Sequence, residues 1–186
     1  RAFAKSIVYH AKKAGFNGTW GPVVDLLNGN GPCSVSRKFG DSPEKVLFVT
    51  EEIAGVFKEY GFMSTGKHYP SGRNEMNIDA HMAESVSSQT RKQLLDDSLF
   101  AYVKMMKAGL LDGVMTSHQK FSNIDDKYPA SLSKKVIDVI RDEGFNGFCI
   151  TDALGMMGIR AKFGDAESKG LAIAAGNDLA LTYTNK

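Results

Sequence analysis

The hydrophobic pattern divides the chain into five similar units. In each unit an amphipathic stretch with helical spacing ends at a glycine, and a short apolar run follows within a few residues. A glycine directly after a helix can adopt the left-handed conformation that closes the last turn. The glycines are Gly15, Gly61, Gly109, Gly144 and Gly176, and the apolar runs are residues 19–24, 62–66, 113–116, 148–150 and 178–181. This pattern predicts five successive helix–strand units.

The apolar runs do not alternate cleanly with polar residues, as is typical of strands that are covered on both faces. Alternating helices and buried strands indicate an α/β fold with parallel strands and right-handed crossovers. Two helices are especially clear. Residues 131–140 carry one apolar stripe of Leu132, Val136, Ile137 and Ile140, with Ser131 or Ser133 as the N-cap. Residues 88–107 predict a single long helix whose buried side carries Leu94, Leu95, Leu99, Tyr102, Val103 and Met106.

Composition narrows the class of protein. A chain of 186 residues with 42% hydrophobic residues can bury the core of one domain. The 23 basic and 21 acidic residues are spread along the chain, so we expect neither nucleic acid nor a membrane surface as a partner. Cys33 and Cys149 predict two unpaired thiols, the second of them in the core. The lack of a visible signal peptide favours the cytoplasm, but Arg1 lies in what reads as mid-helix, so secretion stays open.

Polar and ionisable residues follow the apolar runs. Parallel α/β folds present their binding loops at this end of each strand, so we expect these side chains to line one pocket. Several ionisable groups at one rim are hard to explain as packing, because each would need its own buried partner. In chain order the residues are Asp25 and Arg37, then Lys67, His68, Asp79 and His81, then His118, Asp152, Thr182 and Tyr183.

These residues lie in a series of motifs. The series is Gly21-Pro22-Val23-Val24-Asp25, Arg37-Lys38-Phe39-Gly40-Asp41, Lys67-His68-Tyr69-Pro70, Asp79-Ala80-His81, Val114-Met115-Thr116-Ser117-His118 and Ile150-Thr151-Asp152-Ala153-Leu154-Gly155-Met156. In this order, and across nearly the whole chain, it resembles glycoside hydrolase family 3, most of all the β-N-acetylglucosaminidase branch. The resemblance implies a (β/α)8 TIM-like barrel. Because five units are visible, we expect residues 1–186 to be an internal segment of one barrel catalytic domain, without its first units and its C-terminal end.

The resemblance also implies roles. The Asp at the place of Asp152 attacks the anomeric carbon and forms a covalent glycosyl-enzyme, which water hydrolyses with net retention. Arg37, Lys67 and His68 stand where the family holds sugar hydroxyls. The triplet Asp79-Ala80-His81 stands where that branch has its acid/base histidine, so His81 would transfer the proton and Asp79 would orient its ring. The triplet has Ala80 in place of a hydroxyl residue, and Pro70-Ser71-Gly72-Arg73 replaces a Pro-Gly-Xaa-Gly turn.

Other interpretations compete with these roles. Asp152 could cap the following helix, and His81 could be an ordinary surface histidine. His118 could line the pocket or be a hydrogen-bonded structural residue, and Met156 could be a pocket wall that contacts substrate or a core residue. Asp25 is favoured as a supporting carboxylate. A metal site from His68, His81, His118 and Asp79 is conceivable, but no histidine pair has helical ligand spacing, so we expect no metal and no cofactor.

The sequence therefore predicts a retaining exo-β-glycosidase, with β-N-acetylhexosaminidase ahead of β-glucosidase because of Asp79-Ala80-His81. Its expected partner is a β-linked oligosaccharide or glycoconjugate. The alternative is a non-catalytic carbohydrate-binding fragment of a barrel that keeps Arg37, Lys67 and His68. The oligomeric state and the leaving group are left open.

Overall fold

The computed structural model describes residues 1–27, 37–73 and 85–182. Its central element is a parallel sheet in which the spatial order of the strands follows the chain, from β1 (Gly18–Thr19) through β2 (Met63–Tyr69) and β4 (Gly113–Thr116) to β7 (Phe148–Thr151). A parallel bridge between Ile150 and Leu179 adds the fifth predicted segment beside β7. This succession is that of neighbouring strands in a (β/α) barrel. The five predicted strands are confirmed, although the first and the last form little regular ladder.

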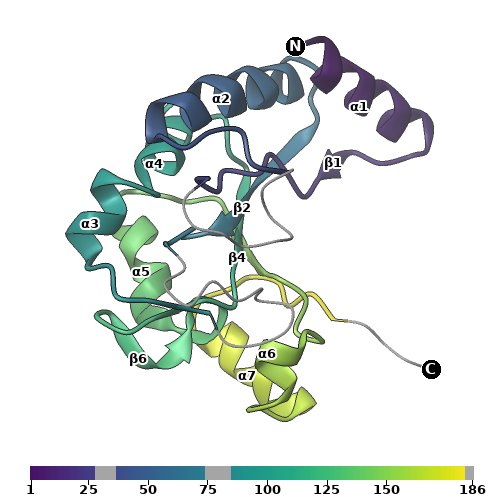
Figure 1. The fold of residues 1–186 in the computed structure, drawn as a ribbon. Helices are drawn as coiled ribbons and strands as arrows, with labels where there is room; N and C mark the ends of the chain where they lie inside the picture. Colours follow the sequence, from purple (N-terminus) through teal and green to yellow (C-terminus); the bar gives the residue numbers. More distant parts are fainter. Residues whose placement is uncertain (28–36, 74–84, 183–186) are drawn as a thin grey trace.

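Helices lie outside this sheet (Figure 1). They are α1 (Ala2–Lys13), α2 (Pro43–Glu59), α3 (Arg91–Asp96), α4 (Phe100–Lys107), α5 (Lys134–Asp142), α6 (Met157–Arg160) and α7 (Asp165–Ala174), with a short 3₁₀ helix, η2 (Ala130–Leu132), before α5. The five predicted glycines all follow helices and all have positive φ, between 57° and 104°. Since this region favours glycine, the helix ends were readable from the sequence.

The prediction of one helix over residues 88–107 is wrong. The segment forms α3 and α4, separated at Asp97, whose φ of −120° and ψ of −96° break the helix. The Asp97 carboxylate accepts hydrogen bonds from Arg73 Nε at 2.8 Å and Gln89 Nε2 at 3.3 Å. The helix thus breaks at a residue that is held by side chains from other segments, and the periodicity of the sequence gives no sign of such contacts. In α4, Met105 is fully buried, whereas Met106, which the sequence placed on the buried side, is only partly buried.

The helix predicted over 131–140 begins later, with Ser133 as the N-cap of α5. Ser133 Oγ accepts a hydrogen bond from Val136 N at 3.3 Å. Ser131, the other candidate cap, lies in η2 and is fully buried. The apolar stripe of α5 is buried as predicted, including Val136, Ile137 and Ile140.

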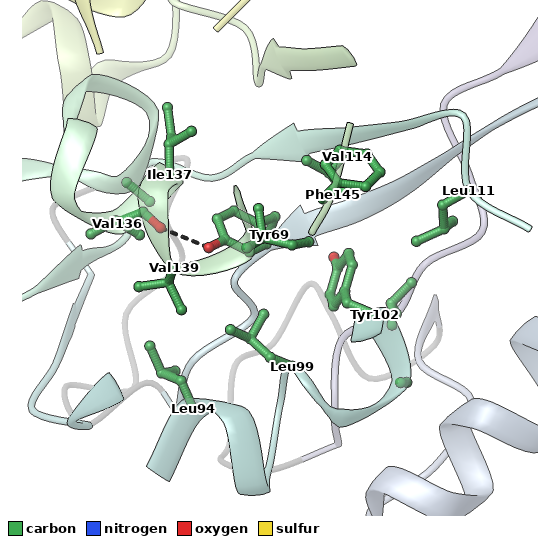
Figure 2. Close-up of a cluster of buried hydrophobic side chains, with 14 of the residues drawn as sticks. Tyr69, Leu94, Leu99, Tyr102, Leu111, Val114, Val136, Ile137, Val139 and Phe145 are labelled. Carbon is green, nitrogen blue, oxygen red and sulfur yellow. Dashed lines mark hydrogen bonds between the residues drawn. The ribbon is translucent and has the colours of Figure 1, made fainter. Parts of the chain in front are cut away.

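The main core lies between the sheet and helices α3, α4 and α5 (Figure 2). Tyr69 and Tyr102 meet edge to face with ring centroids 5.8 Å apart, and the Tyr69 hydroxyl donates to Val136 O at 2.7 Å. Cys149 is a free, buried thiol, as predicted, and burial raises its pKa to about 11 although Arg141 opposes the shift. Cys33 lies outside the described residues.

A second, three-stranded sheet was not predicted. It joins β3 (Val86–Ser87), β5 (Lys120–Phe121) and β6 (Asp125–Pro129), with β3 parallel and β6 antiparallel to β5. Its strands are short and largely polar, so they give no alternating hydrophobic signal. Among the described helices, none is long and apolar enough to cross a membrane.

Candidate active site

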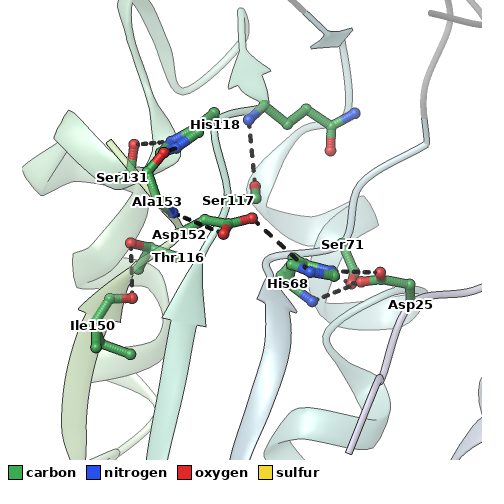
Figure 3. A network of polar contacts seen from close by, with 11 residues as sticks. Asp25, His68, Ser71, Thr116, Ser117, His118, Ser131, Ile150, Asp152 and Ala153 are labelled. Carbon is green, nitrogen blue, oxygen red and sulfur yellow. Dashed lines mark hydrogen bonds and ion pairs between the residues drawn. The ribbon is translucent and has the colours of Figure 1, made fainter. Parts of the chain in front are cut away.

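The carboxyl ends of β2, β4 and β7 bring together side chains that are far apart in the sequence (Figure 3). Lys67 and His68 lie at the end of β2, His118 follows β4, and Asp152 follows β7. Because the strands are parallel neighbours, their ends share one rim. Contacts and charges bring Asp25, Lys67, His68, His118 and Asp152 together at this rim, whereas Tyr183 lies outside the described residues.

The centre of this rim is a row of three side chains, Asp25, His68 and Asp152. Asp25 Oδ2 lies 2.8 Å from His68 Nδ1, and Asp25 Oδ1 accepts a hydrogen bond from His68 N at 2.8 Å. On the other side of the ring, His68 Nε2 lies 3.9 Å from Asp152 Oδ2. The His68 and Asp152 side chains are 18% and 20% exposed, so a ligand can reach them while most of each group is shielded.

An irregularity in β2 places these residues. Lys67 pairs with Met115 and Tyr69 with Thr116, so the register shifts at His68. Such an extra residue re-aims the side chains around it. The segment before Asp25 is hydrogen-bonded to β2 next to this irregularity. Val24 N donates to Lys67 O at 2.7 Å, and Lys67 N donates to Pro22 O.

Charges around the site act on one another. Burial and the neighbouring Arg37 guanidinium lower the pKa of Lys67, while the carboxylates of Asp152 and Asp25 oppose the shift. Arg37 is itself exposed but lies close enough to Lys67 to affect it. Burial alone would raise the pKa of Asp25, but the His68 charge and the hydrogen bonds from His68 and Ser71 hold it well below its usual range. Asp25 is therefore a carboxylate across the physiological pH range.

Asp152 is fixed mainly by the backbone. Its N–H donates to Thr116 O at 2.8 Å, and its Oδ1 accepts from Ala153 N at 2.7 Å. The helix that follows, α6, has Met156 as its N-cap residue. The interpretation of Asp152 as a helix cap is therefore wrong, and Oδ2 is the oxygen that faces His68.

The sequence left His118 and Met156 between a contact with substrate and a structural role, and the structure bears on His118. His118 is 4% exposed, with Nδ1 2.8 Å from Ser131 Oγ and Nε2 2.9 Å from Ala153 O. This geometry favours the structural alternative, in which His118 supports the loop next to Asp152. Met156 is half-buried and Met157 is exposed. Contact between Met156 and a sugar stays a prediction.

Asp79 and His81 lie outside the described residues, but the residues on either side of that segment are well held. The Gln119 amide donates to Arg73 O and to Ser85 Oγ, both at 3.2 Å. Gln89 Oε1 accepts from Arg73 N at 2.6 Å. No sequence motif pointed to Gln119 or Gln89, because their contacts join β3, β5 and the end of β2 only in the fold. Within the described part of the chain, no group of three or more His, Cys, Asp or Glu side chains is arranged so that it could hold a metal ion.

The chain is similar in sequence to curated proteins of one kind. The chain is 29% identical over 170 residues to a beta-hexosaminidase from Tolumonas auensis and 31% identical over 169 residues to one from Psychromonas ingrahamii, in both cases covering 90% of this chain. It spans about half the length of these curated relatives, 50% of each.

Solved structures show the same fold. A family 3 beta-N-acetylglucosaminidase from Paenibacillus sp. superposes with a TM-score of 0.86 at 29% identity, over 94% of this chain and 34% of the other. A beta-N-acetylhexosaminidase from Beutenbergia cavernae superposes with a TM-score of 0.84 at 27% identity, over 94% of this chain and 54% of the other. The predicted TIM-barrel-like α/β fold is thereby confirmed. The model of the glycosyl hydrolase family 3 N terminal domain matches residues 1–186, and the chain belongs to that family.

Proposed function

We propose that the protein containing this chain is a retaining β-N-acetylhexosaminidase that removes terminal β-linked sugars through a covalent glycosyl-enzyme. The observation that carries the proposal is the pose of Asp152. One carboxylate oxygen is anchored by the Ala153 N–H, and the other lies at the rim, 3.9 Å from His68 Nε2. A nucleophile needs this combination of a fixed carboxylate and one oxygen open to the anomeric carbon.

In the first step Asp152 Oδ2 forms a bond to the anomeric carbon while the glycosidic bond breaks. His81 gives its proton to the departing oxygen, and Asp79 orients the imidazole. In the second step His81 takes a proton from water, the water oxygen attacks the anomeric carbon, and Asp152 leaves as a carboxylate. Lys67, His68 and Arg37 hold sugar hydroxyls during both steps.

The choice of His81 as proton donor is supported by the state of Asp25. A carboxyl that donates a proton must be protonated near neutral pH, whereas the pKa of Asp25 is held low by His68 and Ser71. Both oxygens of Asp25 also have close partners. Asp25 is therefore unsuited to the acid role, which the family resemblance assigns to His81 of Asp79-Ala80-His81.

The similarity to proteins named beta-hexosaminidase, and to solved structures titled beta-N-acetylglucosaminidase and beta-N-acetylhexosaminidase, supports the N-acetylated substrate class. The test is to treat the intact protein with a 5-fluoro N-acetylglucosaminyl fluoride and to map the labelled peptide. Label is expected on Asp152. Label on another carboxylate contradicts the assignment, and sugar binding with neither label nor turnover favours the non-catalytic alternative. Turnover of a nitrophenyl β-glucoside in preference to the N-acetylglucosaminide favours β-glucosidase instead.

The proton donor has its own test in His81→Ala. Hydrolysis of a substrate with a good phenolate leaving group should suffer far less than hydrolysis of an oligosaccharide, because phenolate needs little protonation. Added azide should restore the second step. Equal loss with both substrates removes His81 from the acid/base role and leaves Asp152 untouched.

A further inference from the structure

Ser71 has an unusual backbone conformation. Its φ is 61°, and among the described residues it is the one non-glycine residue with positive φ. The left-handed region disfavours side chains with a Cβ, so a serine here is costly unless its hydroxyl contributes something that glycine cannot. The Ser71 hydroxyl donates a hydrogen bond to Asp25 Oδ1 and lies 3.2 Å from His68 O.

The hydrogen-bond partners of Asp25 determine which nitrogen of His68 carries the proton. Asp25 is a carboxylate and can only accept hydrogen bonds. Its Oδ1 takes two donors, His68 N and Ser71 Oγ, and its Oδ2 faces His68 Nδ1 at 2.8 Å. Nδ1 must therefore carry a hydrogen. In the neutral ring this leaves the lone pair on Nε2, the nitrogen that faces Asp152.

We propose that Ser71 is a positioning residue that holds Asp25 in the orientation that fixes the tautomer of His68. With the lone pair on Nε2, the neutral ring accepts a hydrogen bond from a sugar hydroxyl beside the nucleophile. Without the Ser71 hydroxyl, Asp25 has one restraint fewer and can rotate away from Nδ1. The ring then samples the tautomer with hydrogen on Nε2, which cannot accept from the sugar. The role of His68 toward sugar rests on the proposed function, whereas the tautomer does not.

The variant Ser71→Gly separates this role from a structural one. Glycine accepts the left-handed backbone, and the relief of strain offsets the lost hydrogen bond to Asp25, so the melting temperature should change little. The loss of the hydroxyl should nevertheless lower kcat/KM by roughly tenfold, mainly through a higher KM. Ser71→Ala should lower kcat/KM equally while also lowering the melting temperature, because it keeps the Cβ at positive φ.

Gly61→Ser is the matched control. Gly61 has a φ of 57°, and a Cβ added there meets no atom within 4 Å. This change introduces the same backbone cost away from the site, so it should lower stability and leave kcat/KM unchanged. If Ser71→Gly also leaves kcat/KM unchanged, the proposal is wrong.

An activity-free measurement completes the test. The intact protein labelled with ¹⁵N-histidine should show His68, assigned by its loss in His68→Gln, with hydrogen on Nδ1 and none on Nε2 at a pH where the ring is neutral. Ser71→Gly should move these shifts toward a mixture of tautomers. A wild-type ring with hydrogen on Nε2 overturns the proposal. Failure of the fluorosugar to label Asp152 would instead strike the proposed function and leave the tautomer result standing.

Discussion

The two strand ends that meet at this site are built in different ways. At the end of β7, Asp152 is held by main-chain groups, the N–H of Ala153 and the carbonyl of Thr116. At the end of β2, His68 is held by a side chain from another segment, the Asp25 carboxylate, which Ser71 in turn supports. The backbone positions the proposed nucleophile, while a side-chain relay positions the residue that we propose to bind sugar.

Because of this difference, we expect the two strand ends to respond differently to mutation. Main-chain hydrogen bonds at Asp152 survive substitution of the surrounding side chains, so we expect that only a change to Asp152 itself removes the proposed nucleophile. We expect a change to any member of the relay at β2 to weaken it only in part, because Lys67 and the neighbouring Arg37 remain as proposed sugar-binding residues. We therefore expect an all-or-none response at one end and graded responses at the other.

The largest effect is expected for Asp152→Asn. The amide keeps the size of the side chain but cannot form the covalent intermediate, so turnover should fall by several orders of magnitude while folding is preserved. Steady-state kinetics with a nitrophenyl N-acetylglucosaminide measures the loss, and circular dichroism checks the fold. The exposed Asp126, changed to Asn, is the control and should retain full activity. Near-normal turnover in Asp152→Asn would contradict both the nucleophile role and the all-or-none response expected at the end of β7.

A graded loss is expected for Lys67→Ala. A hydrogen bond to a charged group contributes about 1.5–3 kcal/mol, so kcat/KM should fall by roughly ten- to a hundredfold. The exposed Lys135 on α5, changed to Ala, controls for removal of a lysine. Unchanged kcat/KM in Lys67→Ala would remove this residue from the sugar site.

Thr116→Val should affect stability more than chemistry. The buried Thr116 hydroxyl donates to Asn177 Oδ1 at 2.8 Å, and valine removes this donor without changing the shape. A buried polar group that loses its partner costs about 1–3 kcal/mol of unfolding free energy. Urea unfolding measures the cost, and kcat/KM should stay within about twofold, because Asp152 N bonds to the carbonyl of this residue, which the substitution keeps. A large kinetic loss would show that the β7 end also depends on side chains.

The smallest expected effect is on the pH dependence of kcat/KM, and it is confined to alkaline pH. Burial and Arg37 lower the pKa of Lys67, against Asp152 and Asp25, so the positive charge is lost at a lower pH than for a free lysine at about 10.4. As pH rises through that lowered value, kcat/KM should fall. In Lys67→Arg the side chain stays charged at alkaline pH. The fall in kcat/KM at alkaline pH should therefore disappear, whatever the absolute value of kcat/KM in this variant. A profile unchanged in shape would assign the fall to another group.

Much of the fold was readable from the sequence. The five glycines predicted the helix ends, and all five have positive φ. The apolar runs predicted the parallel strands, because a strand buried on both faces has few polar positions. The break at Asp97 and the sheet of β3, β5 and β6 were missed, since short polar strands carry no periodic signal and the contacts of Asp97 come from Arg73 and Gln89.

The candidate site also contains residues that the sequence identified and residues whose role only the structure could decide. Motifs selected Lys67, His68 and Asp152, whose places at strand ends follow from local chain order. His118 was left between two interpretations, and only its contacts with Ser131 Oγ and Ala153 O favour the structural one. Asp79 and His81 lie outside the described residues, so their roles stay predictions.

The sequence by itself determined the succession of the five helix–strand units and the chemical groups at their strand ends, because spacing and turn residues act over a few positions. Only the tertiary structure decided that Asp25 reaches His68, that Ser71 supports Asp25 from 46 positions along the chain, and that Asp152 Oδ2 faces His68 Nε2. Hydrogen bonds at this separation depend on how neighbouring strands register, and register is set by the packing of the whole sheet.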